Sequence, residues 1–342
     1  MTEKGPILVM ENITKRFPGV LAIDDVNFSV VSGEIHGLLG ENGAGKTTLM
    51  KVLYGLYKRD GGRILFDSQI VSIDSPADAK RLGIGMVEQE PQLVPTMPVW
   101  KNIVIGNEPT KKYVINGKKA RNEIKNLQGK YGLEIDLDSE PAHLSAGGKK
   151  ATQILKALYQ HPKILILDEP TTFLTEFEKE KLMKALRGMT AEKEISVVFI
   201  THKLHEVKEV TDRVTVLRNG KVIDTVETGE ASIQGLVRLM IGREVLFKEE
   251  KKRPKKEEKV FEVKGLRAID EDGKDLLKDV SFSVNKGEIF GIVGASGNGQ
   301  KELLEVLMAQ RKAKSGRIFY VGKEWAKDLR NEAAYIPESH ED

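Results

Sequence analysis

The sequence contains no cysteine, which excludes disulfide bonds and cysteine-ligated metal centres. The sequence also has no large excess of charge of either sign, because 54 Lys and Arg residues nearly balance 51 Asp and Glu residues. The composition therefore gives no reason to expect a nucleic-acid partner. The longest apolar runs, such as 164–167 and 197–200, are far shorter than the roughly 20 residues that a membrane helix needs. Any role at a membrane would therefore depend on a partner. The 342 residues are enough for two folded domains.

The most informative stretch is a glycine-rich loop between a short apolar run and a helix-like segment. It follows the pattern G-x-x-x-x-G-K-T. Such a loop turns backbone N–H groups and the positive end of a helix toward a polyphosphate. We expect Lys46 to reach the β- and γ-phosphates of a nucleoside triphosphate and the Thr47 hydroxyl to hold Mg²⁺. The residues expected around the phosphates are Gly40, Glu41, Asn42, Gly43, Ala44, Gly45, Lys46, Thr47 and Thr48.

A second motif is the apolar run 164–167, which ends in Asp168 and Glu169. A carboxylate at the C-terminal end of a strand can hold Mg²⁺, which suits Asp168. The adjacent Glu169 could accept the proton of an attacking water as general base. An acidic pair at the start of a helix is the structural alternative, and the phosphate loop upstream favours the catalytic interpretation.

Two polar residues follow other strand-like runs. Gln89 comes after the run 83–87 and precedes a proline, and from there it could reach Mg²⁺ or water when the loop moves. His202 follows the run 195–201 and could hydrogen-bond the γ-phosphate. Taken alone, each fits a structural role better than a catalytic one.

Ser145 and Phe17 leave two interpretations open. Ser145 fits the N-cap of a helical stretch at 149–159. With Gly147, it could instead form a second phosphate-binding helix end that serves the ATP of another subunit. Phe17 could stack on an adenine ring or pack in the core, and the sequence favours neither.

Periodicity and turn residues predict the main elements. We expect buried strands at 35–39, 164–167 and 195–201, because these runs are short and apolar. A helix is expected from the phosphate loop to about residue 57, and a β-hairpin around Asn219 and Gly220. The stretch 107–117 is expected to be a loop.

Beyond residue 245 the chain changes character and then repeats itself. Residues 248–259 are almost all charged and include a proline, which indicates a solvated linker rather than a helical extension. Segments 25–30, 33–35 and 62–64 then recur with one common offset, and Gln300 stands at the position of Lys46. The expected division is a complete domain at 1–245 with a helical subdomain at about 93–160, a linker at 246–259 and a partial second domain at 260–342.

Together and in this order, these motifs resemble those of the ATP-binding subunits of ABC transporters. The family's Walker A, Q-loop, signature, Walker B and H-loop motifs match, in that order, residues 40–48, Gln89, 144–147, 164–169 and His202. The tandem layout, with a degenerate second Walker A, is similar to that of importers of simple sugars and nucleosides. The resemblance implies an α/β fold of the P-loop NTPase type, with a mixed sheet core and a helical subdomain, followed by a partial second copy.

The resemblance also implies a function. The chain would be an ATPase that uses ATP and Mg²⁺ to energise the import of nucleosides or simple sugars. Its partners would be transmembrane permease subunits and a substrate-binding protein, and it would lie on the cytoplasmic face of the cell membrane. Two such domains would dimerise head to tail, so that Ser145 and Gly147 of one contact the γ-phosphate bound to the other.

The sequence departs from the family pattern at Ala146, Gly148 and Ala151, and its second copy has no signature, Walker B or H-loop. We therefore expect either a shortened form of a longer protein or a partner that supplies the rest. Two alternatives stay open: a soluble tandem ABC ATPase that acts on ribosomes or DNA, and an ATP-binding chain without useful turnover. The short, charge-mixed segment 248–259 is unlike the long basic linker expected of the first alternative.

Overall fold

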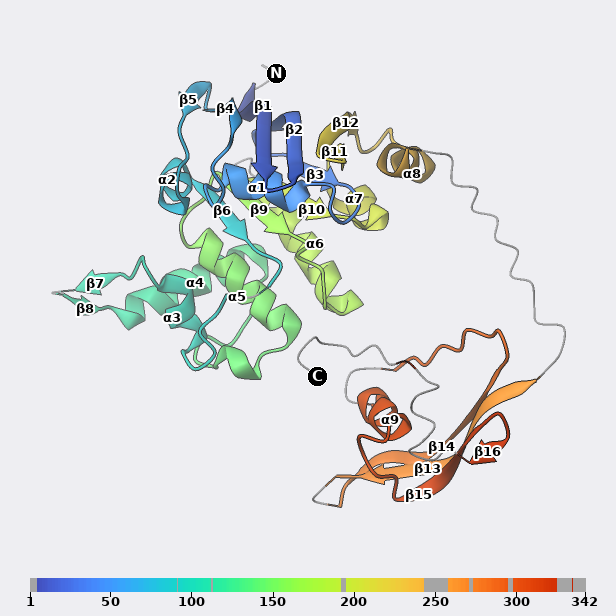
Figure 1. Ribbon diagram of the computed structural model, residues 1–342. Coiled ribbons are helices and arrows are strands. Elements are labelled where there is room, and N and C mark those ends of the chain that lie inside the picture. The colour runs from blue at the N-terminus through green and yellow to red at the C-terminus, as the bar shows by residue number, and fades with distance from the viewer. Residues whose placement is uncertain are drawn as a thin grey trace. The chain divides into compact units, whose positions relative to one another are not determined.

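The chain divides into two units, Met1–Leu246 and Phe247–Asp342, in a computed structural model (Figure 1). The structure describes residues 5–90, 92–111, 113–191, 195–242, 258–270, 273–294, 298–324 and 334. The predicted linker at 246–259 lies outside the described residues except for its last two positions.

Two sheets form the first unit. The antiparallel sheet has the strand order β2-β1-β4-β5, with β1 at Pro6–Phe17, β2 at Val20–Val31, β4 at Gly61–Phe66 and β5 at Gln69–Val71. The other sheet has the order β12-β11-β3-β10-β9-β6 and is parallel except for the β11–β12 hairpin. Its strands are β3 (Ile35–Leu39), β6 (Ile84–Val87), β9 (Ile164–Asp168), β10 (Ser196–Thr201), β11 (Arg213–Arg218) and β12 (Lys221–Glu227).

The central strands β3, β9 and β10 are buried at every position, as the unbroken apolar runs predicted. In the pairing register Thr201 lies beside Leu39 and Ile200 beside Asp168, so the three strands end at one edge of the sheet. The segments that follow them therefore meet at that edge.

Side chains of these strands alternate between two cores. One face, with Ile164 and Val198, packs against the antiparallel sheet and α1 (Lys46–Leu53). The opposite face, with Leu165 and Phe199, packs against a helical layer. That layer contains α3 (Val99–Val104), α4 (Gly117–Tyr131), α5 (Ala146–Leu158) and α6 (Glu176–Ala191). Figure 1 shows α3, α4 and α5 grouped together.

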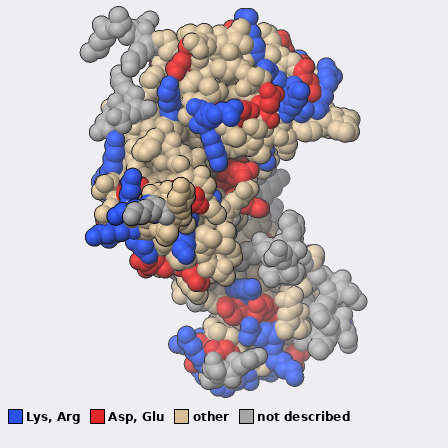
Figure 2. All heavy atoms as spheres, turned by 90° about the vertical axis from the view of Figure 1, so that its left-hand side faces the viewer, with Lys and Arg blue, Asp and Glu red and all other residues tan. Residues whose placement is uncertain are grey.

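Shorter elements complete the first unit. They are α2 (Pro76–Leu82), the hairpin of β7 (Thr110–Lys111) and β8 (Val114–Ile115), the 3-10 turn η1 (Pro141–His143), α7 (Leu204–Val210) and α8 (Ile233–Ile241). The β7–β8 hairpin stands where a loop was expected, because strands of two residues leave no periodic pattern in the sequence. Among the described residues, no helix combines the length and apolar character required to cross a bilayer. Basic and acidic side chains are interspersed over the face in Figure 2.

The second unit repeats the antiparallel part of the first. Its sheet has the order β14-β13-β15-β16, with β13 at Lys259–Ile269, β14 at Asp275–Asn285, β15 at Ser315–Tyr320 and β16 at Lys323–Glu324. Helix α9 (Gln300–Leu307) follows Gly299, whose φ of 97° resembles the 103° of Gly45 before α1. Residues 289–293, which correspond to β3, form no strand, and Ile289 and Val293 are 97% and 98% exposed.

Candidate active site

The phosphate loop joins the end of β3 to the start of α1. A Cβ at Gly40 would lie 2.3 Å from the Leu217 carbonyl oxygen, so only glycine fits there. The Lys46 ammonium donates hydrogen bonds to the carbonyl oxygens of Gly40 at 2.8 Å and of Glu41 at 2.9 Å, which folds the side chain across the loop. Burial lowers the pKa of Lys46, and the carboxylates of Glu169 and Asp168 oppose that shift.

Asp168 ends β9 beside the phosphate loop, and its side chain is buried. Burial raises the pKa of its carboxyl group, while a hydrogen bond from the Thr47 hydroxyl opposes the rise. Within the described parts of the chain, Asp168 Oδ1 has no hydrogen-bond partner. A buried carboxylate oxygen without a partner, next to a hydroxyl, has the hard-oxygen chemistry that suits a divalent cation.

Glu169 and His202 form a close pair at the same edge of the sheet. His202 Nδ1 lies 2.7 Å from Glu169 Oε1. The Glu169 backbone adopts a φ of 42°, a left-handed conformation that costs a non-glycine residue free energy, and its N–H donates to the Ile200 carbonyl at 3.0 Å. The turn therefore holds the carboxylate at the strand end despite the strain.

A cavity of about 500 Å³ opens over the phosphate loop. Gln89 and Glu169 line it together with residues 42–48. The cavity is also lined by residues that the sequence did not single out for the site: Val20, Leu21, Ala22, Asn219 and Gly220. The turn at 219–220 was visible in the sequence, but its position depends on a tertiary contact: the Gly220 N–H donates to the Ala44 carbonyl at 3.0 Å.

Phe17 lies at the end of β1, outside the residues that line this cavity. Its ring packs edge-on against Tyr57, with centroids 5.3 Å apart. Across the β1–β2 turn it pairs with Val20, which lines the cavity and is 60% exposed. Phe17 thus packs in the hairpin next to the cavity mouth.

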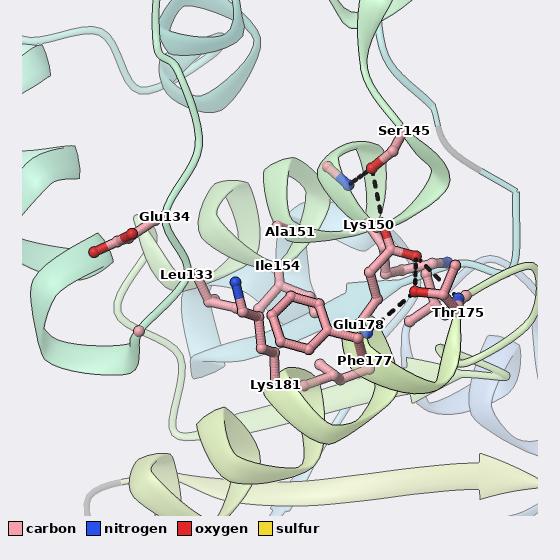
Figure 3. Close-up of a pocket in the computed structure, with 15 residues that line it drawn as sticks. Leu133, Glu134, Ser145, Lys150, Ala151, Ile154, Thr175, Phe177, Glu178 and Lys181 are labelled. Carbon is pink, nitrogen blue, oxygen red and sulfur yellow. Dashed lines mark hydrogen bonds between the residues drawn. The ribbon is translucent and has the colours of Figure 1, made fainter.

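The signature segment lines a separate pocket of about 340 Å³ between the starts of α5 and α6 (Figure 3). Ser145 is the N-cap of α5 and accepts the Gly148 N–H at 3.1 Å. The Ser145 hydroxyl donates to Glu178 Oε1 at 2.9 Å, and the Gly147 N–H donates to the same side chain. Within one unit, the structure therefore does not bring Ser145 and Gly147 to the phosphate loop.

Lys150, one turn into α5, was not singled out as a site residue by the sequence. Its side chain is buried, and its ammonium donates to the carbonyl oxygens of Glu88 at 3.0 Å and Gln89 at 2.9 Å. Burial lowers the pKa of Lys150 to about 8, and the Asp168 carboxylate opposes that shift. The signature helix is thereby bonded to the segment that carries Gln89.

Comparison with known proteins agrees with this α/β P-loop architecture. A solved ATP-binding cassette of an ABC transporter in its ADP conformation superposes with a TM-score of 0.61 at 29% identity, covering 70% of this chain and 99% of that one. The sequence profile described as ABC transporter matches residues 23–172 and 277–342. The chain belongs to this family, and the predicted family and fold class are confirmed.

Two curated relatives are similar to this chain over most of its length and are themselves longer proteins. The chain is 45% identical to the guanosine import ATP-binding protein of Bacillus subtilis, over 93% of this chain and 62% of that protein. It is 40% identical to the glucose import ATP-binding protein of Haloferax volcanii, over 98% and 67%. The chain thus spans roughly two thirds of the length of these relatives.

Proposed function

We propose that this chain binds and hydrolyses ATP with Mg²⁺ and so energises the import of a nucleoside or simple sugar. The observation that carries the proposal is the meeting of Lys46, Asp168 and the Glu169–His202 pair at one edge of the sheet. The names of the relatives, which import guanosine and glucose, support the substrate class.

The residues beside the phosphate loop fit a magnesium ion. Thr47 and Asp168 would hold it, the latter through the buried Oδ1 that has no partner in the described chain, and Gln89 would approach it from the cavity wall. When bound there, Mg²⁺ would neutralise the charge that builds up on the phosphates.

The hydrolytic step uses the chain's own carboxylate. Glu169 accepts a proton from the attacking water, whose oxygen forms the new bond to the γ-phosphorus while the bond to the ADP oxygen breaks. Lys46 offers its charge to the γ-phosphate once its bonds to the loop carbonyls are exchanged for phosphate oxygens. His202 holds the Glu169 carboxylate in place, and we assign it a contact with the same phosphate.

The nucleotide base would lie at the mouth of the cavity. The exposed Val20 and the neighbouring Leu21 offer apolar surface there, and Phe17 supports the same hairpin. We propose that Phe17, beside its hairpin partner Val20, contacts the adenine ring.

Productive turnover requires a second domain. Ser145 and Gly147 line a pocket apart from the phosphate loop, so the signature can contact a γ-phosphate only when the loop comes from a facing domain. The partners in import would be transmembrane permease subunits and a substrate-binding protein, with this chain on the cytoplasmic face of the membrane.

Glu169→Gln tests the proposal. The variant should bind MgATP as tightly as the wild type, because the phosphate contacts are kept. It should hydrolyse MgATP at least about a hundredfold more slowly, because the general base is removed. Activity per molecule should rise with protein concentration if two copies pair. Hydrolysis by Glu169→Gln at the wild-type rate, or binding unaffected by Lys46→Ala, would refute the assignment.

A further inference from the structure

Two side chains of α5 hold three successive backbone carbonyls of the segment 88–90. Lys150 Nζ bonds the carbonyl oxygens of Glu88 and Gln89, and Gln153 Nε2 donates to that of Glu90 at 3.1 Å. Because Lys150 and Gln153 are three positions apart, they lie on one face of the helix. The backbone around Gln89 is therefore attached to the signature helix.

The two bonds of Lys150 fix a bend in the chain. Successive residues of a strand direct their carbonyl groups to opposite sides, so Glu88 and Gln89 can share one ammonium only where the chain leaves the extended conformation after β6. An ammonium group carries three donors and no acceptor, which suits two carbonyl oxygens at once. The bend lies where the exposed Gln89 side chain lines the cavity over the phosphate loop.

The burial of the Lys150 ammonium group has to be compensated by hydrogen bonds. Its side chain is 4% exposed, and a buried ammonium raises the free energy of the folded state unless hydrogen bonds compensate it. The adjacent Lys149 is only partly buried, so α5 does not need a buried lysine merely to carry charge.

Helix α5 carries a second functional end. Its N-cap is Ser145, the residue that the proposed function assigns to the γ-phosphate of a facing domain. Figure 3 shows Lys150 and Ser145 on the same helix at one pocket. These hydrogen bonds thus connect the segment 88–90 to the helix whose N-terminus bears Ser145.

We propose that Lys150 is a positioning residue, which holds Gln89 in a fixed relation to the signature end of α5 and so couples nucleotide binding at the phosphate loop to Ser145. This inference rests on the proposed function. Lys150 acts through Gln89 and does not itself contact the nucleotide.

Hydrogen exchange with and without MgATP tests the coupling in the full chain. In the wild type, MgATP should slow amide exchange in three segments: 40–48, 86–90 and 145–149. Lys150→Met should keep the slowing at 40–48 and lose most of it in the other two segments. Lys150→Arg, which restores donors, should recover the response, and the matched control Lys149→Met should behave like the wild type.

Turnover gives a second readout. In Lys150→Met, kcat should fall about tenfold or more while KM for MgATP stays within about twofold, because positioning is lost and phosphate binding is kept. A wild-type exchange response in Lys150→Met, an equal loss in Lys149→Met, or a loss that extends to 40–48 would overturn the inference. If MgATP slows no exchange at 40–48 in the wild type, the proposed function fails instead.

Discussion

The Glu178 carboxylate lies 2.9 Å from the Ser145 hydroxyl and also accepts the Gly147 N–H. Its other oxygen accepts the Thr175 N–H at 2.9 Å, so the start of α6 holds the side chain in place. The Glu178 carboxylate therefore occupies the hydrogen-bond donors at the N-terminus of α5. A γ-phosphate from a facing domain would need the same two donors.

Glu178→Gln is expected to strengthen ATP-driven pairing, because it removes a negative charge from the place that a phosphate must enter. In a Glu169→Gln background, the ATP concentration for half-maximal dimer formation should fall about threefold, as measured by analytical ultracentrifugation. The exposed Glu180→Gln serves as the control. An unchanged or higher ATP requirement would contradict competition by Glu178.

Asp168→Asn is expected to raise stability and remove the response to magnesium. Burial raises the pKa of Asp168, so its charged form costs the folded state free energy that an amide of the same shape avoids. Thermal unfolding should shift upward by a few degrees, whereas the exposed Asp224→Asn should not change it. Chelation of Mg²⁺ should weaken ATP binding by the wild type only, and a variant that keeps full magnesium dependence would refute the assignment.

Lys150 should give stability a distinct dependence on pH. Its pKa is about 8 in the folded chain against an ordinary 10.5, so the unfolded chain holds the proton more tightly between these values. The free energy of unfolding should therefore rise from about pH 8 to 10.5 by no more than roughly 3 kcal/mol. Urea unfolding should show this rise flattened in Lys150→Met and kept in Lys149→Met, and parallel slopes would argue against it.

Phe17→Ala separates base stacking from packing. If the ring contacts adenine, ATP affinity should fall about tenfold, while affinity for inorganic tripolyphosphate, which has no base, should not change. Calorimetric titration of both ligands measures this. Equal losses for the two ligands would mean that Phe17 only packs the hairpin against Tyr57.

The parts of the fold that could be predicted from the sequence are those determined by local patterns of apolar and turn residues. Buried parallel strands leave unbroken apolar runs, so 35–39 and 164–167 could be found directly. The Asn-Gly pair at 219–220 predicts a hairpin turn because asparagine and glycine tolerate positive φ, and in the structure the two residues have φ of 50° and 75°. The helix expected to continue to residue 57 ends at Leu53, because Gly55 takes a left-handed conformation with φ of 76°.

The remaining site features depend on contacts between distant residues. Lys150 and Glu88 are 62 residues apart, and Ser145 and Glu178 are 33 apart. Backbone carbonyl acceptors leave no trace in a sequence, so nothing distinguishes Lys150 from Lys149 until the chain is folded. The environment of Phe17 stayed open for the same reason.

The strand order has a consequence for the timing of folding. β3, which leads into the phosphate loop, pairs with β10 and β11, and those strands begin only at Ser196 and Arg213. During synthesis β3 must wait for well over a hundred further residues before either neighbour exists. The phosphate loop is thus made long before the neighbours of β3, and the nucleotide site cannot be completed until β10 and β11 have been synthesised.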